Sequence, residues 1–312
     1  MQITTNTRAF IEAEQYSSFI LTNLHDGMLP GQFYRDVSDF SAGETLNIKT
    51  LGAAVIQEAA EDTPLVYTAL DTGTVTLGIT NYEGDAWYIG DVLRQDGAQV
   101  EQLAAERGAE STRALQEVVE TKFLKACNDA QTDAGANLIN GFAHRISSTE
   151  TNNVLGLGDL IKMKLAFDKA KVPYAGRVAI LDPVAGATLD GLTTISKDVT
   201  PFGQMILENG FDRDHEFLMN LYGWNIITSN RLDQGDFSDG TTAVTGAVAN
   251  VFMSVLDDQH KPMMLAWRQQ PSVEGERNKD EGRDEFVARQ RYGIGAQRVD
   301  TLGIYITSAT NF

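Results

Sequence analysis

Residues 96–130 read DGAQVEQLAAERGAESTRALQEVVETKFLKACNDA and carry a long helical pattern. Small or apolar residues recur three or four positions apart, which is the spacing of one helix face: Val100, Leu103, Ala104, Gly108, Ser111, Ala114, Leu115, Val118 and Ala126. Asp96, with Gln99 three residues later, fits an N-cap and its capping-box partner. A helix of about 33 residues would be about 50 Å long. We therefore expect a spine helix that crosses a whole domain.

The apolar face of this predicted helix is narrow. Arg107 and Lys122 fall on or beside it, so the face is interrupted and does not form a clean heptad seam. A β-strand pattern leads directly into the helix, and no catalytic motif is attached to it. These features favour an architectural role over a chemical one.

Composition limits the class of protein. The chain has 312 residues, 42% of them hydrophobic, with only 7 prolines, which is typical of one large or two ordinary globular domains. The formal net charge is −18. Tight nucleic-acid binding needs clustered Lys and Arg to neutralise phosphates, so we do not expect binding over the whole surface.

Three further features bear on compartment. Cys127 is the only cysteine, which excludes an intramolecular disulfide and a multi-cysteine metal site, and we expect it to be a small buried hydrophobic residue. No apolar run approaches the length of about 18 residues that a membrane helix needs. The first residues, MQITTNTRAFIEAEQ, lack the order of a signal peptide. We expect a soluble protein made in a reducing cytoplasm.

Residues 1–42 lack the pattern of a compact unit. One short amphipathic helix is predicted from a helical stripe made by Phe10, Ala13, Tyr16, Ser17, Ile20 and Leu24. A break at Pro30-Gly31 and an aromatic linker, GQFYRDVSDF, follow it. We expect an arm with exposed aromatic residues to pack on a protein surface. The sequence leaves open whether this surface belongs to the same chain or to a neighbouring subunit.

Residues 43–90 predict a β-hairpin. Apolar residues alternate with polar ones in TLNIKT (45–50) and TVTLGIT (74–80), the period of half-buried strands. The intervening segment is acidic and far longer than the 2–5 residues or so of an ordinary hairpin loop. A long two-stranded projection is marginally stable alone, so we expect it to lie on another surface, most plausibly another subunit. The segment YEGDAWYIGDVL then returns the chain to the spine.

Residues 135–245 predict a compact α/β domain. A helix is expected in GLGDLIKMKLAFDKAKVP, with Asp159 near its N-cap. A buried strand follows from Arg177 to Pro183, then a helix in PVAGATLDGLTTI and a second strand at Trp224–Thr228.

From about residue 246 the pattern becomes β. Strands are predicted in VANVFMSVL, PMMLAW, DEFVARQRYGIGAQRV and TLGIYITS, and the charged segment PSVEGERNKDEGRDE (271–285) is predicted to be an exposed loop. These strands need a partner surface, and the apolar face of the spine is the candidate. The spine's domain would then be discontinuous, interrupted by the α/β unit.

No catalytic constellation is present. The four histidines, His25, His144, His215 and His260, form no metal-binding pattern, and there is no nucleophile elbow or Walker lysine loop. Neither the glycines at 156 and 158 nor those of GIGAQ at 293 match the glycine-rich motif of a dinucleotide-binding site. Asp233, Asp236 and Asp239 lack the spacing of a calcium loop, so we interpret them as a polar turn, with an opportunistic cation as the alternative. We predict no catalytic residue, no cofactor and no metal.

The order of these segments resembles the major capsid proteins of tailed double-stranded-DNA bacteriophages, which have the Hong Kong 97-like fold. The segments that carry the resemblance are GETLNIKTLG, TVTLGITNYEGDAWYIGDV, KVPYAGRVAILDP, LYGWNIITSNRL and RYGIGAQRVDTLGIYI. They cover residues 43–312 in order. Each segment is only a short strand-and-turn sequence. The resemblance is therefore specific because the segments occur in the same order along the chain.

The resemblance implies an α+β fold with four parts. These are an N-terminal arm (1–42), an extended β-hairpin loop (43–85), a peripheral domain with the spine helix (86–134 and 246–312) and an axial α/β domain (135–245). It also implies a structural protein, not an enzyme, that is made in the host cytoplasm and assembles into hexamers and pentamers. These would close an icosahedral shell of the virion around double-stranded DNA, without sequence-specific binding and without a membrane. The implied partners are a scaffolding protein and a portal, and a decoration protein is an optional third.

Some members of the family crosslink a Lys to an Asn. Lys49 lies in the corresponding region, but no pattern fixes a partner Asn or a catalytic acid, so crosslinking is not inferred. Because the hairpin begins by residue 43, we expect an arm and no long cleavable scaffold segment before it.

The charges of the loop suggest a contact between subunits. Lys49 is outnumbered there by Glu44, Glu58, Glu61, Asp62 and Asp71. Our hypothesis is that this acidic loop lies over a basic patch of the adjacent subunit, with Arg277, Lys279 and Arg283 as candidates. The alternative is a solvated charged loop.

Two other functions stay open at this point. An encapsulin-like compartment shell would have the same fold with enzyme cargo in place of a genome. A metal-dependent hydrolase that uses the Asp233–Asp239 region would be a monomer or a small oligomer.

Overall fold

The structure is a computed structural model that describes residues 29, 31–38, 43–52, 56–58, 61, 67, 69, 72–96, 100–131, 137–195 and 217–311. A four-stranded sheet has the order β1 (Arg35–Asp36), β13 (Met263–Asn278), β14 (Arg283–Ala296) and β4 (Asn81–Gly90). A seven-stranded sheet has the order β7 (Arg145–Ser147), β15 (Leu302–Ser308), β12 (Ala243–Ser254), β8 (Arg177–Leu181), β10 (Trp224–Thr228) and β9 (Phe217–Leu221), with β11 (Gln234–Ser238) paired to β12.

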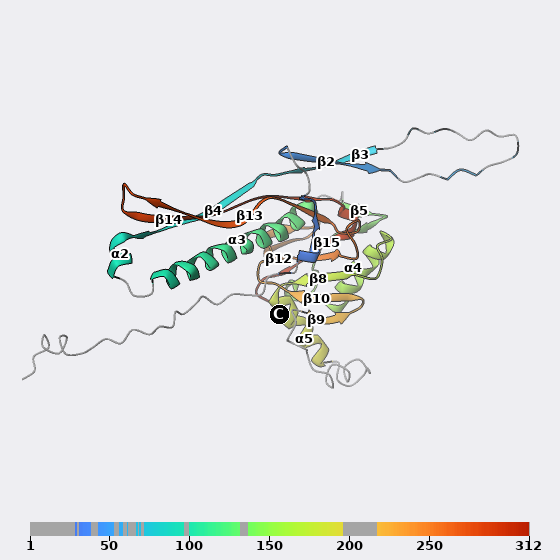
Figure 1. Cartoon of the computed structure of the whole chain (residues 1–312). Coiled ribbons are helices and arrows are strands. Elements are labelled where there is room, and N and C mark those ends of the chain that lie inside the picture. Colours follow the sequence, from blue (N-terminus) through green and yellow to red (C-terminus); the bar gives the residue numbers. More distant parts are fainter. Residues whose placement is uncertain are drawn as a thin grey trace, which may run out of the picture.

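The remaining described elements are two small hairpins and the helices. The hairpins are β2 (Thr45–Leu51) with β3 (Thr72–Gly78), and β5 (Leu138–Ile139) with β6 (Phe142–Ala143). The helices are η1 (Gly31–Phe33), α2 (Asp91–Asp96), α3 (Val100–Ala130), η3 (Thr151–Asn153), α4 (Leu157–Lys169), α5 (Pro183–Ile195) and η5 (Val299–Thr301). Helix α3 runs alongside the four-stranded sheet and ends at the seven-stranded sheet (Figure 1). The predicted α+β class is confirmed.

The spine helix α3 spans 31 residues and ends at Ala130, as predicted. Its start differs from the prediction, because Asp96 is the last residue of α2 and α3 begins at Val100. The predicted N-cap at Asp96 is therefore wrong. Gly108 does not break the helix. The buried residues concentrate in the second half of α3: Ser111, Leu115, Val119, Glu120, Phe123, Leu124, Cys127 and Asn128.

The second half of α3 enters the core of the seven-stranded sheet. Phe123, Leu124 and Cys127 share a hydrophobic cluster with residues of β8, β10, β12, β13 and β15, including Val251 and Ile304. Burial raises the pKa of the Cys127 thiol, so this thiol stays protonated and packs as a small hydrophobic group. The spine helix therefore packs against both sheets.

The carboxyl end of α3 is buried, so its last carbonyl groups need donors. Arg145 of β7 supplies them: its guanidinium donates to the Asn128 carbonyl at 3.3 Å, to Asn128 Oδ1 at 2.8 Å and to the Gln131 carbonyl at 3.0 Å. The Gln131 side chain in turn donates to the carbonyls of Val299 and Leu302 at 2.8 and 2.7 Å. A cation at this end also favours the helix dipole.

Helices α4 and α5 cover the other face of the seven-stranded sheet. Their cluster includes Phe167 of α4 and Trp224, with ring centroids 4.9 Å apart. Successive residues of β8 alternate between the two faces, which makes all five of its residues buried. The predicted strands at 177–181 and 224–228 and the predicted helix at 183–195 are present, and Asp159 accepts the Gly156 N–H at 2.9 Å at the start of α4.

The C-terminal strands divide between the two sheets, which the sequence did not predict. Strands β13 and β14 lie along α3, as expected, but β12 and β15 pair with each other, and β12 also pairs with β8. Every residue of β15 is buried. A strand buried on both faces needs cover from two layers, and the seven-stranded sheet between α3 and the pair α4–α5 provides it.

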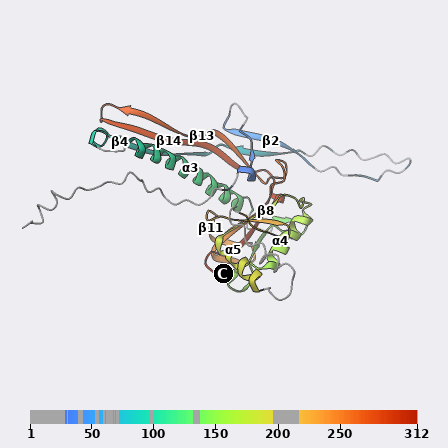
Figure 2. The same ribbon diagram turned by 60° about the horizontal axis from the view of Figure 1, so that its bottom comes forward.

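The segment 271–285 is not the exposed loop that the sequence predicted. It forms the outer half of the β13–β14 hairpin, which runs beside α3 as far as α2 (Figure 2). Register places Arg277 opposite Asp284. Cross-strand pairs of opposite charge stabilise a sheet as apolar pairs do, but they leave no hydrophobic alternation to detect.

Candidate interaction surfaces

The β2–β3 hairpin is anchored at its base and projects beyond the rest of the described chain. Leu77 is completely buried against Met264 and Ala266 of β13, and Leu46 and Ile48 pack on the same cluster. The predicted alternation in both strands is therefore correct. Figure 1 shows β2 and β3 leaving the body on the side opposite to α2. Farther out, Ile56 and Tyr67 are 89% and 99% exposed.

Two glycines of β14 allow the base of this hairpin to approach. A Cβ atom on Gly293 would lie 2.4 Å from the carbonyl oxygen of Gly78, and one on Gly295 would lie 2.8 Å from Leu77 Cδ1. Gly293 has no room for a side chain, because it faces backbone, whereas a side chain at position 295 would require Leu77 to shift. In the sequence, GIGAQ stood out only as a failed nucleotide motif. The overlooked signal is a pair of glycines two residues apart within a strand, which indicates close backbone approach on one face.

The described part of the N-terminal arm packs on its own chain. Phe33 is buried, and Tyr34 makes an edge contact with Phe123 of α3 at 5.9 Å between ring centroids. The Leu29 N–H donates to Glu120 Oε2 at 3.2 Å, and β1 then pairs in parallel with β13. For this part of the arm, the surface on which it packs is therefore its own subunit. The predicted helix between Phe10 and Leu24 lies outside the described residues.

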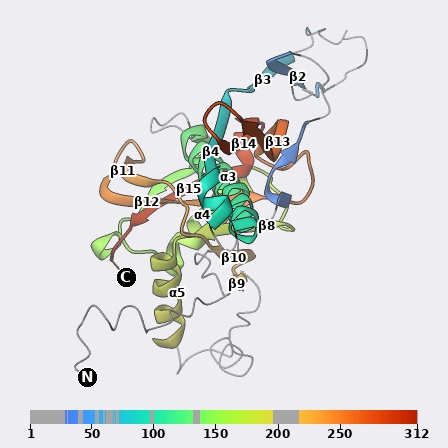
Figure 3. The ribbon, with the colours of Figure 1, turned by 60° about the vertical axis from the view of Figure 1, so that its left-hand side comes forward.

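Polar contacts join the first half of α3 to strand β4. Asp85 Oδ2 accepts hydrogen bonds from Arg107 at 2.7 Å and from Ser111 Oγ at 2.6 Å. Glu83 forms an ion pair with Lys122 and accepts a hydrogen bond from Gln290 at 2.9 Å. These acids explain why Arg107 and Lys122 interrupt the apolar face of the spine. Figure 3 shows α3 nearly end-on beneath β4, β14 and β13.

Alternating charges fix α2 to the tip of the β13–β14 hairpin. Arg277 donates to both carboxylate oxygens of Asp91, at 2.7 and 2.8 Å, and to Asp284 at 3.1 Å. The hydrogen bonds from Arg277 lower the pKa of Asp91. Arg283 pairs with Glu285 at 2.7 Å and lies over the Tyr88 ring at 4.6 Å.

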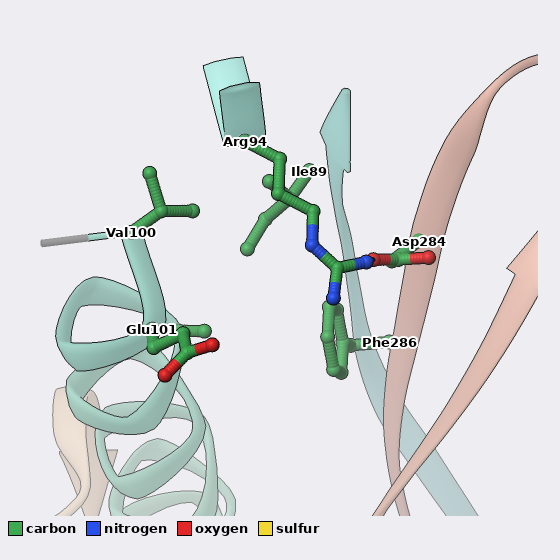
Figure 4. A pocket seen from close by; sticks show the side chains of 7 residues that line it. Ile89, Arg94, Val100, Glu101, Asp284 and Phe286 are labelled. Atoms are coloured by element: carbon green, nitrogen blue, oxygen red, sulfur yellow. Dashed lines mark hydrogen bonds and ion pairs between the residues drawn. The ribbon is translucent and has the colours of Figure 1, made fainter. Parts of the chain in front are cut away.

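A cavity of about 400 Å³ lies between this tip and the first turn of α3. Figure 4 shows Arg94 directed toward Asp284, above the ring of Phe286, with Val100 and Glu101 of α3 across the cavity. The cavity is lined by a few residues, some apolar and some charged, and they include no group of catalytic side chains.

The chain matches the model of a family described as phage capsid protein over residues 74–307, well over half of its length. This protein belongs to that phage capsid protein family. It is therefore a structural protein of a capsid shell, and its place is the virion capsid. No curated protein matches the chain.

Solved capsid structures have the same fold as this capsid protein. The capsid of the cyanophage P-SCSP1u is 15% identical, with a TM-score of 0.72 over 97% of this chain and 94% of that one. Mycobacterium phage Che8 gives 16% identity and a TM-score of 0.68 over 97% and 98%, and the capsid of the native GTA particle 12% and 0.66 over 99% of both. The predicted Hong Kong 97-like fold is confirmed.

The residues of the predicted contact between subunits lie at two ends of the capsid protein. Lys49 is on β2, where it donates to Thr74 Oγ1 at 3.1 Å. Glu58 and Glu61 are exposed farther along the loop, and Asp62 lies outside the described residues. Arg277, Lys279 and Arg283 lie at the hairpin tip beside α2. The two groups do not meet within one chain (Figure 1).

The three aspartates near β11 accept structural hydrogen bonds. Asp239 accepts the N–H groups of Thr241, Thr242 and Ser147 at 2.8, 2.7 and 3.0 Å. Asp236 accepts the Gly246 N–H at 2.9 Å, and Asp233 accepts from Asn128 Nδ2 at 2.8 Å. The interpretation as one polar turn is wrong, because Asp236 lies within strand β11 and only Asp239 lies at the turn that follows this strand. Among the described residues, no helix is long and apolar enough to cross a membrane.

Replacing Gly293 by Ala should lower the free energy of unfolding by about 1–3 kcal/mol, because the new Cβ would overpack against the Gly78 carbonyl. Gly108→Ala is the matched control: no atom lies within 4 Å of a Cβ there, and Ala favours a helix by up to about 1 kcal/mol. Urea unfolding of the unassembled subunit measures both. Equal effects of the two substitutions would contradict the close approach of the hairpin base.

Proposed function

We propose that this capsid protein assembles as hexamers and pentamers into an icosahedral shell that encloses double-stranded DNA. The observation that supports this most is the pair of projections, β2–β3 at one end and β13–β14 with α2 at the other. Each extends beyond the cores of the two sheets. Long two-stranded projections are unfavourable in a monomer, but they become contacts when copies pack side by side.

The charge of the chain supports enclosure of DNA without sequence-specific binding. At a net charge of −18, repulsion from phosphates would keep packaged DNA from adhering to the inner surface. The protein would act with no catalytic step and would be made in the host cytoplasm. A scaffolding protein and a portal would complete the assembly, with a decoration protein as an optional third partner.

The proposed division of the chain follows from the same resemblance. It has an arm (1–42), an extended loop (43–85), a peripheral domain (86–134 and 246–312) and an axial domain (135–245). The hydrogen bonds of β12 and β15 favour moving these two strands to the axial domain.

Electron micrographs of the purified protein should show closed particles of uniform size with fivefold and sixfold clusters of subunits. The expected cause is burial of the two projections between neighbouring copies. A preparation that holds only monomers or small oligomers under all assembly conditions would contradict the proposal. Enzyme cargo in place of DNA within particles isolated from infected cells would favour the encapsulin-like alternative.

The predicted contact of the acidic loop remains a proposal, with altered partners. Arg277 and Arg283 already have carboxylate partners at the tip, so they offer little unneutralised charge. Arg289 and Arg291 form no ion pair with the described residues, and they share the outward face of the sheet with Tyr82, which is 61% exposed. We propose that Glu58, Glu61 and Asp62 of one copy lie over Arg289 and Arg291 of the next.

Reversing the charge of Glu58 and Glu61 to Lys should lower the yield of shells and make the remaining shells sensitive to salt. A single exposed ion pair contributes only about 0–1 kcal/mol, so the effect depends on its repetition over many copies. Adding Arg289→Glu and Arg291→Glu should restore the yield. Glu106→Lys, on an exposed position of α3, is the control. Normal yield and salt response of the first variant would refute the contact.

A further inference from the structure

One turn of α4 exposes apolar residues that its own core does not use. The inner face of this helix, with Leu160, Met163 and Phe167, is completely buried in the axial cluster. The outer face carries Ile161 and Leu165, one turn apart, which are 47% and 44% exposed. A surface helix of a globular protein normally has a polar outer face. These two side chains therefore need another explanation.

Lysines surround this apolar pair, and we call the whole surface the lysine face. It comprises Ile161, Lys162, Lys164, Leu165, Lys169, Lys171 and Tyr174. Lys164 Nζ lies 5.8 Å from the centre of the Tyr174 ring, and Lys169 Nζ lies 5.5 Å from that of Phe142. Within the described part of the chain, Lys164, Lys169 and Lys171 form no ion pair. Figure 1 shows α4 at the right-hand margin, with none of the described elements outside it.

The opposite side of the same sheet carries acids. Asp129 on the last turn of α3 is exposed, and so is Asp236 of β11, three residues after Asp233. Asp233 links the two elements by accepting from Asn128. We call these three residues the acidic edge, and Lys125 lies among them, 3.9 Å from Asp129 and 3.4 Å from Asp233.

The two surfaces lie on opposite faces of one sheet. Helix α4 packs on the side of Ala179 and Leu181, whereas Phe237 of β11 and the end of α3 pack on the side of Val178 and Ile180. A contact between the lysine face of one copy and the acidic edge of the next would use two different patches. Such head-to-tail contacts generate rings when the rotation between copies closes, and open filaments when it does not.

We propose that the lysine face of α4 docks on the acidic edge of a second copy of this chain. The inference rests on the proposed self-assembly and names one contact within it. Opposite charges would set the register of the two copies, and the apolar pair would form the dry centre of the contact. Nucleic acid would neutralise the lysines but would leave Ile161 and Leu165 in water, so the aliphatic centre favours a protein surface.

The test compares three variants with the wild-type protein. Lys164→Glu with Lys169→Glu should lower the yield of rings and shells by about tenfold or more, because like charges would then face each other. Adding Asp129→Lys and Asp236→Lys to the same chain should restore the yield. Lys164→Arg with Lys169→Arg keeps the charge and should assemble normally. Thermal unfolding of the unassembled subunits verifies that each variant is folded.

A second variant tests the apolar centre. Ile161→Ser with Leu165→Ser should leave the thermal unfolding of the subunit nearly unchanged, because both side chains are exposed, while assembly falls. Three results would overturn the proposal: normal assembly of the Lys→Glu variant, failure of the Asp→Lys changes to restore assembly, or normal shells with less DNA inside them. Failure of the wild-type protein to form shells would instead contradict the proposed function itself.

Discussion

The carboxyl end of the spine helix lies inside the protein, and this constraint orders the rest of the subunit. A helix that ends in a core leaves carbonyl groups without partners, and each buried group of this kind is costly. Hydrogen bonds from Arg145 and Gln131 avoid this cost. They join the helix end to β7 and to the start of β15. The seven-stranded sheet therefore fixes one end of α3, and the helix carries the second sheet away from it.

The other half of α3 is joined differently. Near its start the helix meets β4 through carboxylates, arginine and serine, with small residues on its inner face. The tip beyond it relies on the charge pairs of Arg277 and Asp91. One end of the subunit is thus an apolar core and the other a polar, two-layered extension. This asymmetry suits a shell protein whose extension is completed by neighbouring copies.

Sequence patterns predicted those elements whose own residues carry an apolar run or a regular apolar spacing. The buried run at 177–181, the helix at 183–195 and the alternating strands of the β2–β3 hairpin were all correct. The outer half of β13–β14 was missed because charges replace apolar residues there. Arg145 and Gly293 were missed because their partners are brought near only by the tertiary fold. No local pattern marks Arg145, whereas the spacing of Gly293 and Gly295 is a local signal that was overlooked.

Urea unfolding of an Arg145→Met variant tests most directly whether the buried helix end holds the subunit together. We predict a loss of about 2–4 kcal/mol in the free energy of unfolding, because Asn128 Oδ1 and the Gln131 carbonyl would lose the Arg145 donor and the helix end would lose a cation. Arg298→Met is the control, since Arg298 is exposed and pairs only loosely with Asp300, at 3.7 Å. A loss for Arg145→Met no larger than that of the control would contradict the central role of the buried helix end.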